Sequence, residues 1–98
     1  MSKITKDTIY TSSLTAKRDG EIETSFATQP YLTGGMYIAI SIPGQSMPIQ
    51  QSQSHKSFAK WVKGSIKLME KNGLVVETTE RTYGDWFTEE EIKEYLNN

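Results

Sequence analysis

Residues 36–42 have the sequence Met-Tyr-Ile-Ala-Ile-Ser-Ile, in which large apolar side chains alternate with smaller or more polar ones. Alternation of period two places successive side chains on opposite faces of a strand, so one face of this segment must be buried. We therefore expect a central strand that ends at Pro43-Gly44, because proline and glycine terminate strands. Such a strand requires other strands beside it and a cover over its apolar face.

Two further strands are predicted at residues 9–17 and 22–28, which are rich in Thr and Ser. The dipeptide Asp19-Gly20 lies between them and favours the two-residue turn of a β-hairpin, because glycine tolerates positive φ. This turn places Arg18 opposite Glu21. Regular pairing from there predicts that Leu14 and Phe26 lie on opposite faces of the hairpin.

A helix is predicted over residues 55–72, where apolar side chains recur at intervals of three and four residues. Ser54 or Ser57 supplies its N-cap, and Asn72-Gly73 supplies a left-handed stop. Residues 74–79 contain mostly apolar or β-branched side chains, which predicts another strand.

A second helix is predicted to begin after Thr88. Thr88 is its N-cap, Glu91 completes a capping box, and Phe87 and Ile92 occupy the two positions of a hydrophobic staple.

The predicted order is thus β-β-β-α-β-α. Strands joined by hairpin signals before the helices indicate an α+β fold with a four-stranded, mainly antiparallel sheet and two helices. The 98 residues are 36% hydrophobic, which is enough for one core, so a single domain is expected over residues 1–98. No run approaches the roughly 20 apolar residues that span a bilayer, so we expect a soluble domain without a membrane partner.

Residues 43–54 are predicted to form a polar loop, which is long for a chain of this size. Loops of this length are often functional, so the glutamines Gln50, Gln51 and Gln53 are candidate contacts for a partner.

The predicted helix carries its lysines on one side. At about 100° per residue, five of them fall within about 40° of the pole opposite Phe58: Lys56, Lys60, Lys63, Lys67 and Lys71. We name this set the lysine stripe. It predicts contact with a phosphate backbone or an acidic protein surface, and the alternative is an ordinary solvated helix face.

The C-terminal region is acidic. Residues 74–98 hold seven acidic side chains against Arg81 and Lys93. Glu89, Glu90 and Glu94 are candidate partner contacts that could imitate a nucleic-acid backbone, and the alternative is helix capping with a solvated face.

His55 is the only histidine, and it lies at the start of the predicted helix. The positive end of the helix is expected to lower its pKa, so a general base is conceivable. The alternative is a surface or capping histidine. The chain has no partner residue at the spacing of a catalytic triad, and no cysteine.

The chain contains no nucleotide-binding glycine motif, metal-ligand cluster or nucleophile motif, so we expect no enzyme activity, no cofactor and no metal site. A chain without cysteine suits the reducing cytoplasm. The expected function is binding to a larger protein or nucleoprotein complex. We expect the chain to belong to the accessory proteins of phages and mobile elements. This class includes inhibitors of bacterial defence systems such as CRISPR complexes.

Three alternatives stay open. The lysine stripe predicts direct binding of nucleic acid. A small enzyme that uses His55 is the least expected function. An edge strand rich in Ser and Thr predicts pairing with a second copy of the chain, so a homodimer is a further expectation.

Overall fold

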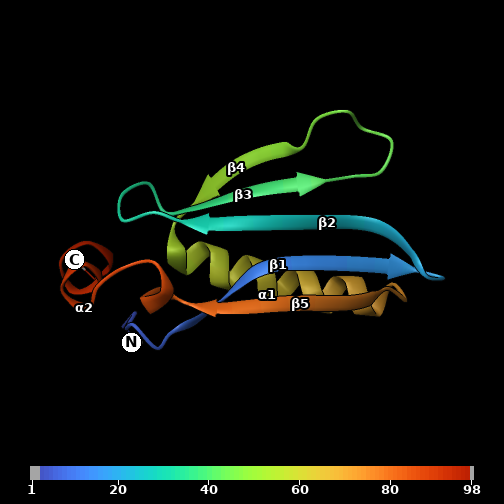
Figure 1. The fold of residues 1–98 in the computed structure, drawn as a ribbon. Coiled ribbons are helices and arrows are strands. Elements are labelled where there is room, and N and C mark those ends of the chain that lie inside the picture. The colour runs from blue at the N-terminus through green and yellow to red at the C-terminus, as the bar shows by residue number, and fades with distance from the viewer. Residues whose placement is uncertain (1–2, 98) are drawn as a thin grey trace.

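A five-stranded antiparallel sheet covered on one face by a long helix forms the fold in the computed structural model, which describes residues 3–97 (Figure 1). The strands are β1 (Ile9–Arg18), β2 (Glu21–Pro30), β3 (Met36–Ser41), β4 (Ile49–Gln53) and β5 (Val75–Thr82). The long helix is α1 (His55–Lys71). A 3-10 turn, Tyr83–Asp85, leads to the short helix α2 (Glu89–Glu91), which continues as a π-helical turn, Ile92–Leu96.

The strand order is β4-β3-β2-β1-β5, and every neighbouring pair is antiparallel. Helix α1 carries the chain from β4 at one edge to β5 at the other. The α+β class, the antiparallel sheet and the two helices are confirmed. The central strand is β2, whereas the prediction placed β3 there, although β3 does have a strand on each side.

The prediction of four strands was wrong, because part of the expected 43–54 loop forms β4 and the order becomes β-β-β-β-α-β-α. Glutamine and serine have weak strand preferences, so the sequence of β4 resembles a loop. Its pairing with β3 places Ile49 opposite Ile40 and supplies the backbone hydrogen bonds. That gain depends on a neighbouring strand and does not appear in local sequence.

The core lies between α1 and the inner face of the sheet. The sheet contributes buried Leu14, Ala16, Phe26, Met36 and Ile38, and the helix contributes Phe58 and Val62. The ring centroids of Phe26 and Trp61 are 5.2 Å apart, and those of Phe26 and Phe58 are 6.4 Å apart. Because each buried side chain of this size contributes about 1.5–3 kcal/mol, this layer is the main stabilising contact of α1.

The pairing of β1 contains two irregularities, and they correct the predicted faces of the hairpin. Arg18 does pair with Glu21, and Asp19 and Gly20 both have positive φ, as the turn requires. A register shift then brings Leu14 opposite Phe26, so both face the core. A second shift, between Thr11 and Ser13, lies in the pairing with β5. Extra residues at bulges reverse the alternation of a strand, which simple counting cannot detect.

Both helix starts agree with the predictions. The Ser54 hydroxyl accepts a hydrogen bond from the Ser57 N–H at 3.1 Å, so Ser54 is the N-cap of α1. Thr88 and Glu91 form the predicted capping box. After α1, Gly73 has φ +85° and ends the helix. Within residues 3–97, no helix has the length and apolar character that crossing a membrane demands.

Candidate functional site

The lysine stripe lies along the outer side of α1, and all five of its lysines are exposed. Lys60, Lys63, Lys67 and Lys71 form no ion pair with another residue of the described chain. At about 1.5 Å per residue, the stripe extends over about 22 Å from Lys56 to Lys71. The helix therefore presents a row of positive charge that acidic side chains of the fold leave largely uncompensated.

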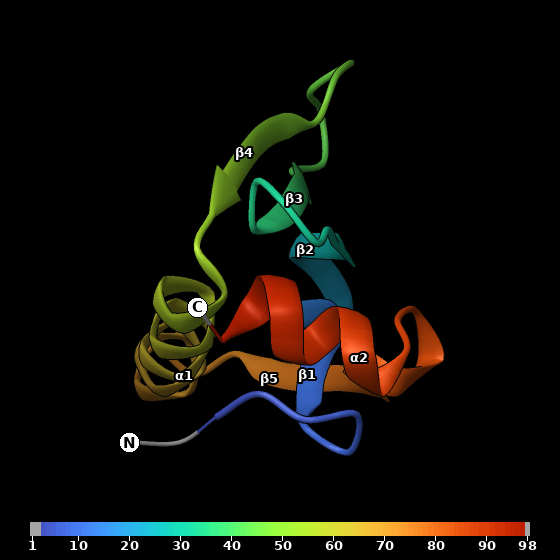
Figure 2. The same ribbon diagram turned by 90° about the vertical axis from the view of Figure 1, so that its left-hand side faces the viewer.

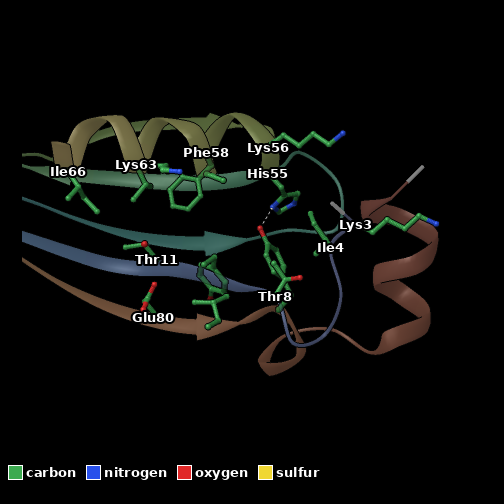
Figure 3. A pocket seen from close by; sticks show the side chains of 15 residues that line it. Lys3, Ile4, Thr8, Thr11, His55, Lys56, Phe58, Lys63, Ile66 and Glu80 are labelled. Carbon is green, nitrogen blue, oxygen red and sulfur yellow. Dashed lines mark hydrogen bonds between the residues drawn. The ribbon is translucent and has the colours of Figure 1, made fainter. Parts of the chain in front are cut away.

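A cleft of about 410 Å³ lies beside the stripe, between α1 and the β1–β5 side of the sheet (Figure 3). Phe58, Val62 and Ile66 of α1 form one wall. Lys63 lies on the helix side, and Glu80 lies opposite on β5. Pockets of this size with mostly apolar walls and a few polar groups are typical of binding sites.

The cleft exists because β5 does not fill the space under this side of the helix. The register pairs Thr78 with the inward-facing Leu14, and Glu80 with Thr11, so these two β5 side chains face the helix. Neither is a large apolar residue that could pack against α1. As a result, Ile9 at the border of the cleft stays 60% exposed, although it lies on the core side of β1.

His55 lies at one end of the cleft and joins α1 to two other segments (Figure 3). Its Nδ1 is 3.0 Å from the Tyr83 hydroxyl, and its Nε2 is 3.0 Å from the Tyr31 carbonyl oxygen. A carbonyl oxygen only accepts, so Nε2 carries the proton and donates. In the neutral ring, Nδ1 then accepts from the Tyr83 hydroxyl. Both ring nitrogens are bonded to protein groups, so His55 has the geometry of a structural side chain.

Burial favours the neutral forms of His55 and Tyr83. It lowers the pKa of His55 below its ordinary value of 6.5, and the bond to the Tyr31 carbonyl opposes that shift. Burial also raises the pKa of Tyr83. The predicted direction for His55 is confirmed, but the principal cause is desolvation and not the helix N-terminus.

A pH titration of stability should detect His55. Its folded-state pKa is depressed, so the unfolded state binds the proton more readily. The free energy of unfolding should therefore be highest above pH 6.5 and fall as the pH drops from 6.5 through the lower folded-state pKa. His55→Asn, which cannot titrate, should be less stable at pH 8 and should lose less stability between pH 8 and pH 5. Denaturant unfolding at several pH values provides the measurement, and identical pH profiles for both proteins would contradict the assignment.

The other predicted contact residues lie away from the cleft. Helix α2 lies at one end of the sheet, where Glu89 and Glu90 are exposed in its first turn (Figures 1 and 2). Glu94 is exposed in the following π-helical turn. None of these three glutamates lines the cleft beside the lysine stripe.

The glutamines lie on the opposite edge of the sheet from β5. They belong to β4 and not to a loop. Gln50 is exposed on the outer face, whereas Gln51 and Gln53 pair with the buried Ile38 and Met36 and are half-buried on the inner face. Of the three predicted groups, only the lysine stripe contributes residues to the lining of the cleft, namely Lys56 and Lys63.

The cleft and its lining residues, such as Tyr83, Ile66 and Glu80, could not be predicted from the sequence. The helical pattern placed Ile66 on the apolar side of α1, but no sequence signal shows that the facing strand leaves it uncovered. The contact of Tyr83 with His55 joins residues 28 positions apart, so no local pattern could predict it.

In the part of the chain that the structure describes, no three His, Asp or Glu side chains are grouped where they could hold a metal ion. Comparisons with protein families, with curated proteins and with solved structures find no match to this chain.

Proposed function

We propose that this chain is a non-enzymatic binding protein whose lysine stripe and adjoining cleft dock onto an acidic surface of a larger protein or nucleoprotein complex. The observation that carries the proposal is the row of exposed lysines beside a cleft with apolar walls. Four of these lysines form no ion pair within the described residues: Lys60, Lys63, Lys67 and Lys71. The charges attract the partner over a distance and orient it. The apolar walls supply surface whose burial stabilises the complex.

The charge pattern of α1 itself supports this proposal. Lys60, Lys63, Lys67 and Lys71 are three or four residues apart, a spacing at which like charges destabilise a helix by a few tenths of a kcal/mol per pair. Stabilisation of the fold alone would favour interleaved acidic residues on this face. An acidic partner would neutralise the repulsion in the complex.

Nucleic acid is the second candidate partner, because the same stripe extends over about 22 Å and carries only lysines. Lysine acts as a point charge and cannot form the bidentate contacts through which arginine recognises guanine. Binding through α1 would therefore contact the phosphate backbone, vary little with sequence and weaken steeply with salt.

Several narrower expectations remain predictions. The proposed partner class is a bacterial defence complex, which this chain would inhibit as a phage or mobile-element accessory protein in the cytoplasm. The glutamates of the C-terminal helix are proposed as a second contact surface. Catalysis by His55 is the least favoured alternative, because both of its ring nitrogens are bonded within the protein.

Reversing two charges of the stripe tests the proposal. Lys60→Glu/Lys67→Glu should weaken capture of the partner from a bacterial lysate about tenfold or more, since rim charges control association. The new glutamates lie three or four residues from Lys56, Lys63 and Lys71, so they should leave the fold as stable or slightly more stable. The matched control is Lys6→Glu/Lys93→Glu, which changes the net charge equally at exposed positions away from the helix.

The pull-down is performed with and without nuclease. A discrete protein complex that survives nuclease and is lost only in the stripe variant supports the proposal. Material that nuclease removes identifies nucleic acid as the partner. Equal capture by the stripe variant and the control would show that α1 is not the contact surface. Thermal unfolding of each variant confirms that differences in capture do not come from loss of the fold.

A further inference from the structure

All 23 charged side chains of the protein lie outside residues 24–54, a stretch of 31 residues without Asp, Glu, Lys or Arg. The structure gathers this stretch on one side of the sheet, where it forms β3, β4 and most of β2. Depletion of charge distinguishes the centre of a protein interface from the rest of a surface. The uncharged side of the sheet is therefore a candidate interface separate from the lysine stripe.

Strand β4 forms the free edge of this uncharged side. Among the described strands, β4 has β3 as its only neighbour, and Figure 2 shows no other described segment beyond it. In an antiparallel strand, every second residue directs its N–H and C=O away from the neighbour it pairs with. The outer side of β4 therefore presents backbone groups that another strand can bind.

The two edges of the sheet differ in their protection. Charged residues, proline and bulges normally prevent an edge strand from pairing with another chain. The β5 edge carries Glu77, Glu80 and Arg81, and its pairing with β1 is bulged. Ile49–Gln53 contains neither charge nor proline, and its register with β3 is regular.

Three exposed apolar side chains lie at or near the β4 edge. Met47 is 72% exposed just before β4, Ile49 is 47% exposed at its start, and Ile42 is 36% exposed after β3. Together with the uncharged strand, they provide apolar surface that pairing at this edge would bring near a partner.

We infer that β4 pairs antiparallel with β4 of a second copy, so that two five-stranded sheets become one continuous sheet. The register that pairs all five residues has its two-fold axis at Gln51. It places Gln50 opposite Ser52 of the second copy, and Ile49 opposite Gln53 of the second copy. Amide and hydroxyl groups both donate and accept hydrogen bonds, so the strand is complementary to itself. A neutral strand also meets its own copy without repulsion, which favours a second copy over a charged partner.

Two double variants at the same exposed outer-face positions, Gln50 and Ser52, test this register. Gln50→Lys/Ser52→Lys places lysine opposite lysine twice per dimer and should raise the dimer dissociation constant about tenfold or more. Gln50→Glu/Ser52→Lys places glutamate opposite lysine twice and should retain the dimer. Both variants alter the same two exposed residues, so neither should disturb the core.

Sedimentation equilibrium at protein concentrations up to about 1 mM gives the measurement. This range reaches dimers whose association free energy is only about 4 kcal/mol, because that energy corresponds to a dissociation constant of about 1 mM. We expect a concentration-dependent dimer for the unaltered chain and for the Glu/Lys variant. A monomer throughout, or equal dimerisation of both variants, overturns the inference. A monomer whose captured lysate partner is lost in the Lys/Lys variant would assign the edge to a different protein. The stripe variant Lys60→Glu/Lys67→Glu should dimerise normally, so the two proposals can fail separately.

Discussion

Phe58→Ala is expected to lower the free energy of unfolding by about 3–5 kcal/mol. Phe58 of α1 is 2% exposed and packs against the sheet, with its ring centroid 6.4 Å from that of Phe26 and 6.2 Å from that of Trp61. Removing the ring leaves a cavity in the layer that holds the helix on the sheet. A domain of this size is stable by only about 5–15 kcal/mol, so the variant should lose a large part of its stability.

Urea unfolding followed by the combined fluorescence of Trp61 and Trp86 measures this loss, and Leu68→Ala is the control on the same helix. Leu68 is 62% exposed, so its truncation should cost no more than about 0.5 kcal/mol. If the two variants lost similar stability, α1 would not cover the sheet through Phe58.

Gly35→Ala is expected to destabilise the fold by at least about 2 kcal/mol. Gly35 has φ +81°, where a side chain is strained, and an added Cβ would lie 2.1 Å from the Gln53 carbonyl oxygen. The obstacle is backbone, so the end of β4 would have to move away from the start of β3. That movement would also disturb the entry to α1, because the Cβ would lie 3.2 Å from the Cα of Ser54.

The adjacent Gly34 provides a matched control. It has φ +94°, but an added Cβ would meet no atom within 4 Å. Gly34→Ala should therefore cost only the conformational strain, about 1–2 kcal/mol. Thermal and urea unfolding give the loss of unfolding free energy for each variant, and the difference between the two losses is the steric contribution at Gly35. Equal losses would mean that the start of β3 does not approach Gln53 of β4 closely.

The elements predicted well are those whose signals lie within a few residues of each other. Asp19 and Gly20 form the turn of the β1–β2 hairpin with positive φ at both residues. Ser54 and Thr88 cap the two helices, and the capping hydrogen bonds join residues only three positions apart. Such bonds depend on side-chain chemistry at fixed spacing and need no distant partner.

The errors concern pairings between distant segments. Strand β4 forms only because β3 presents a free edge, and its own glutamines and serines carry little preference for a strand. The shift that places Leu14 opposite Phe26 results from a bulge, and the Thr28 hydroxyl donates to the carbonyls of Thr11 and Ser12 at the second irregularity. Counting along the chain from the turn cannot anticipate either feature.

The candidate sites divide in the same way. The lysine stripe could be predicted from the sequence, because a period of about 3.6 residues places five lysines on one side of any helix that buries Phe58 and Val62. Three other features became visible only in the folded chain: Glu80 of β5 lies across a cleft from Lys63, Tyr83 bonds His55, and β4 is a free edge. A helix face depends on local geometry, whereas a cleft or a sheet edge depends on which distant segments pack together and which leave space between them.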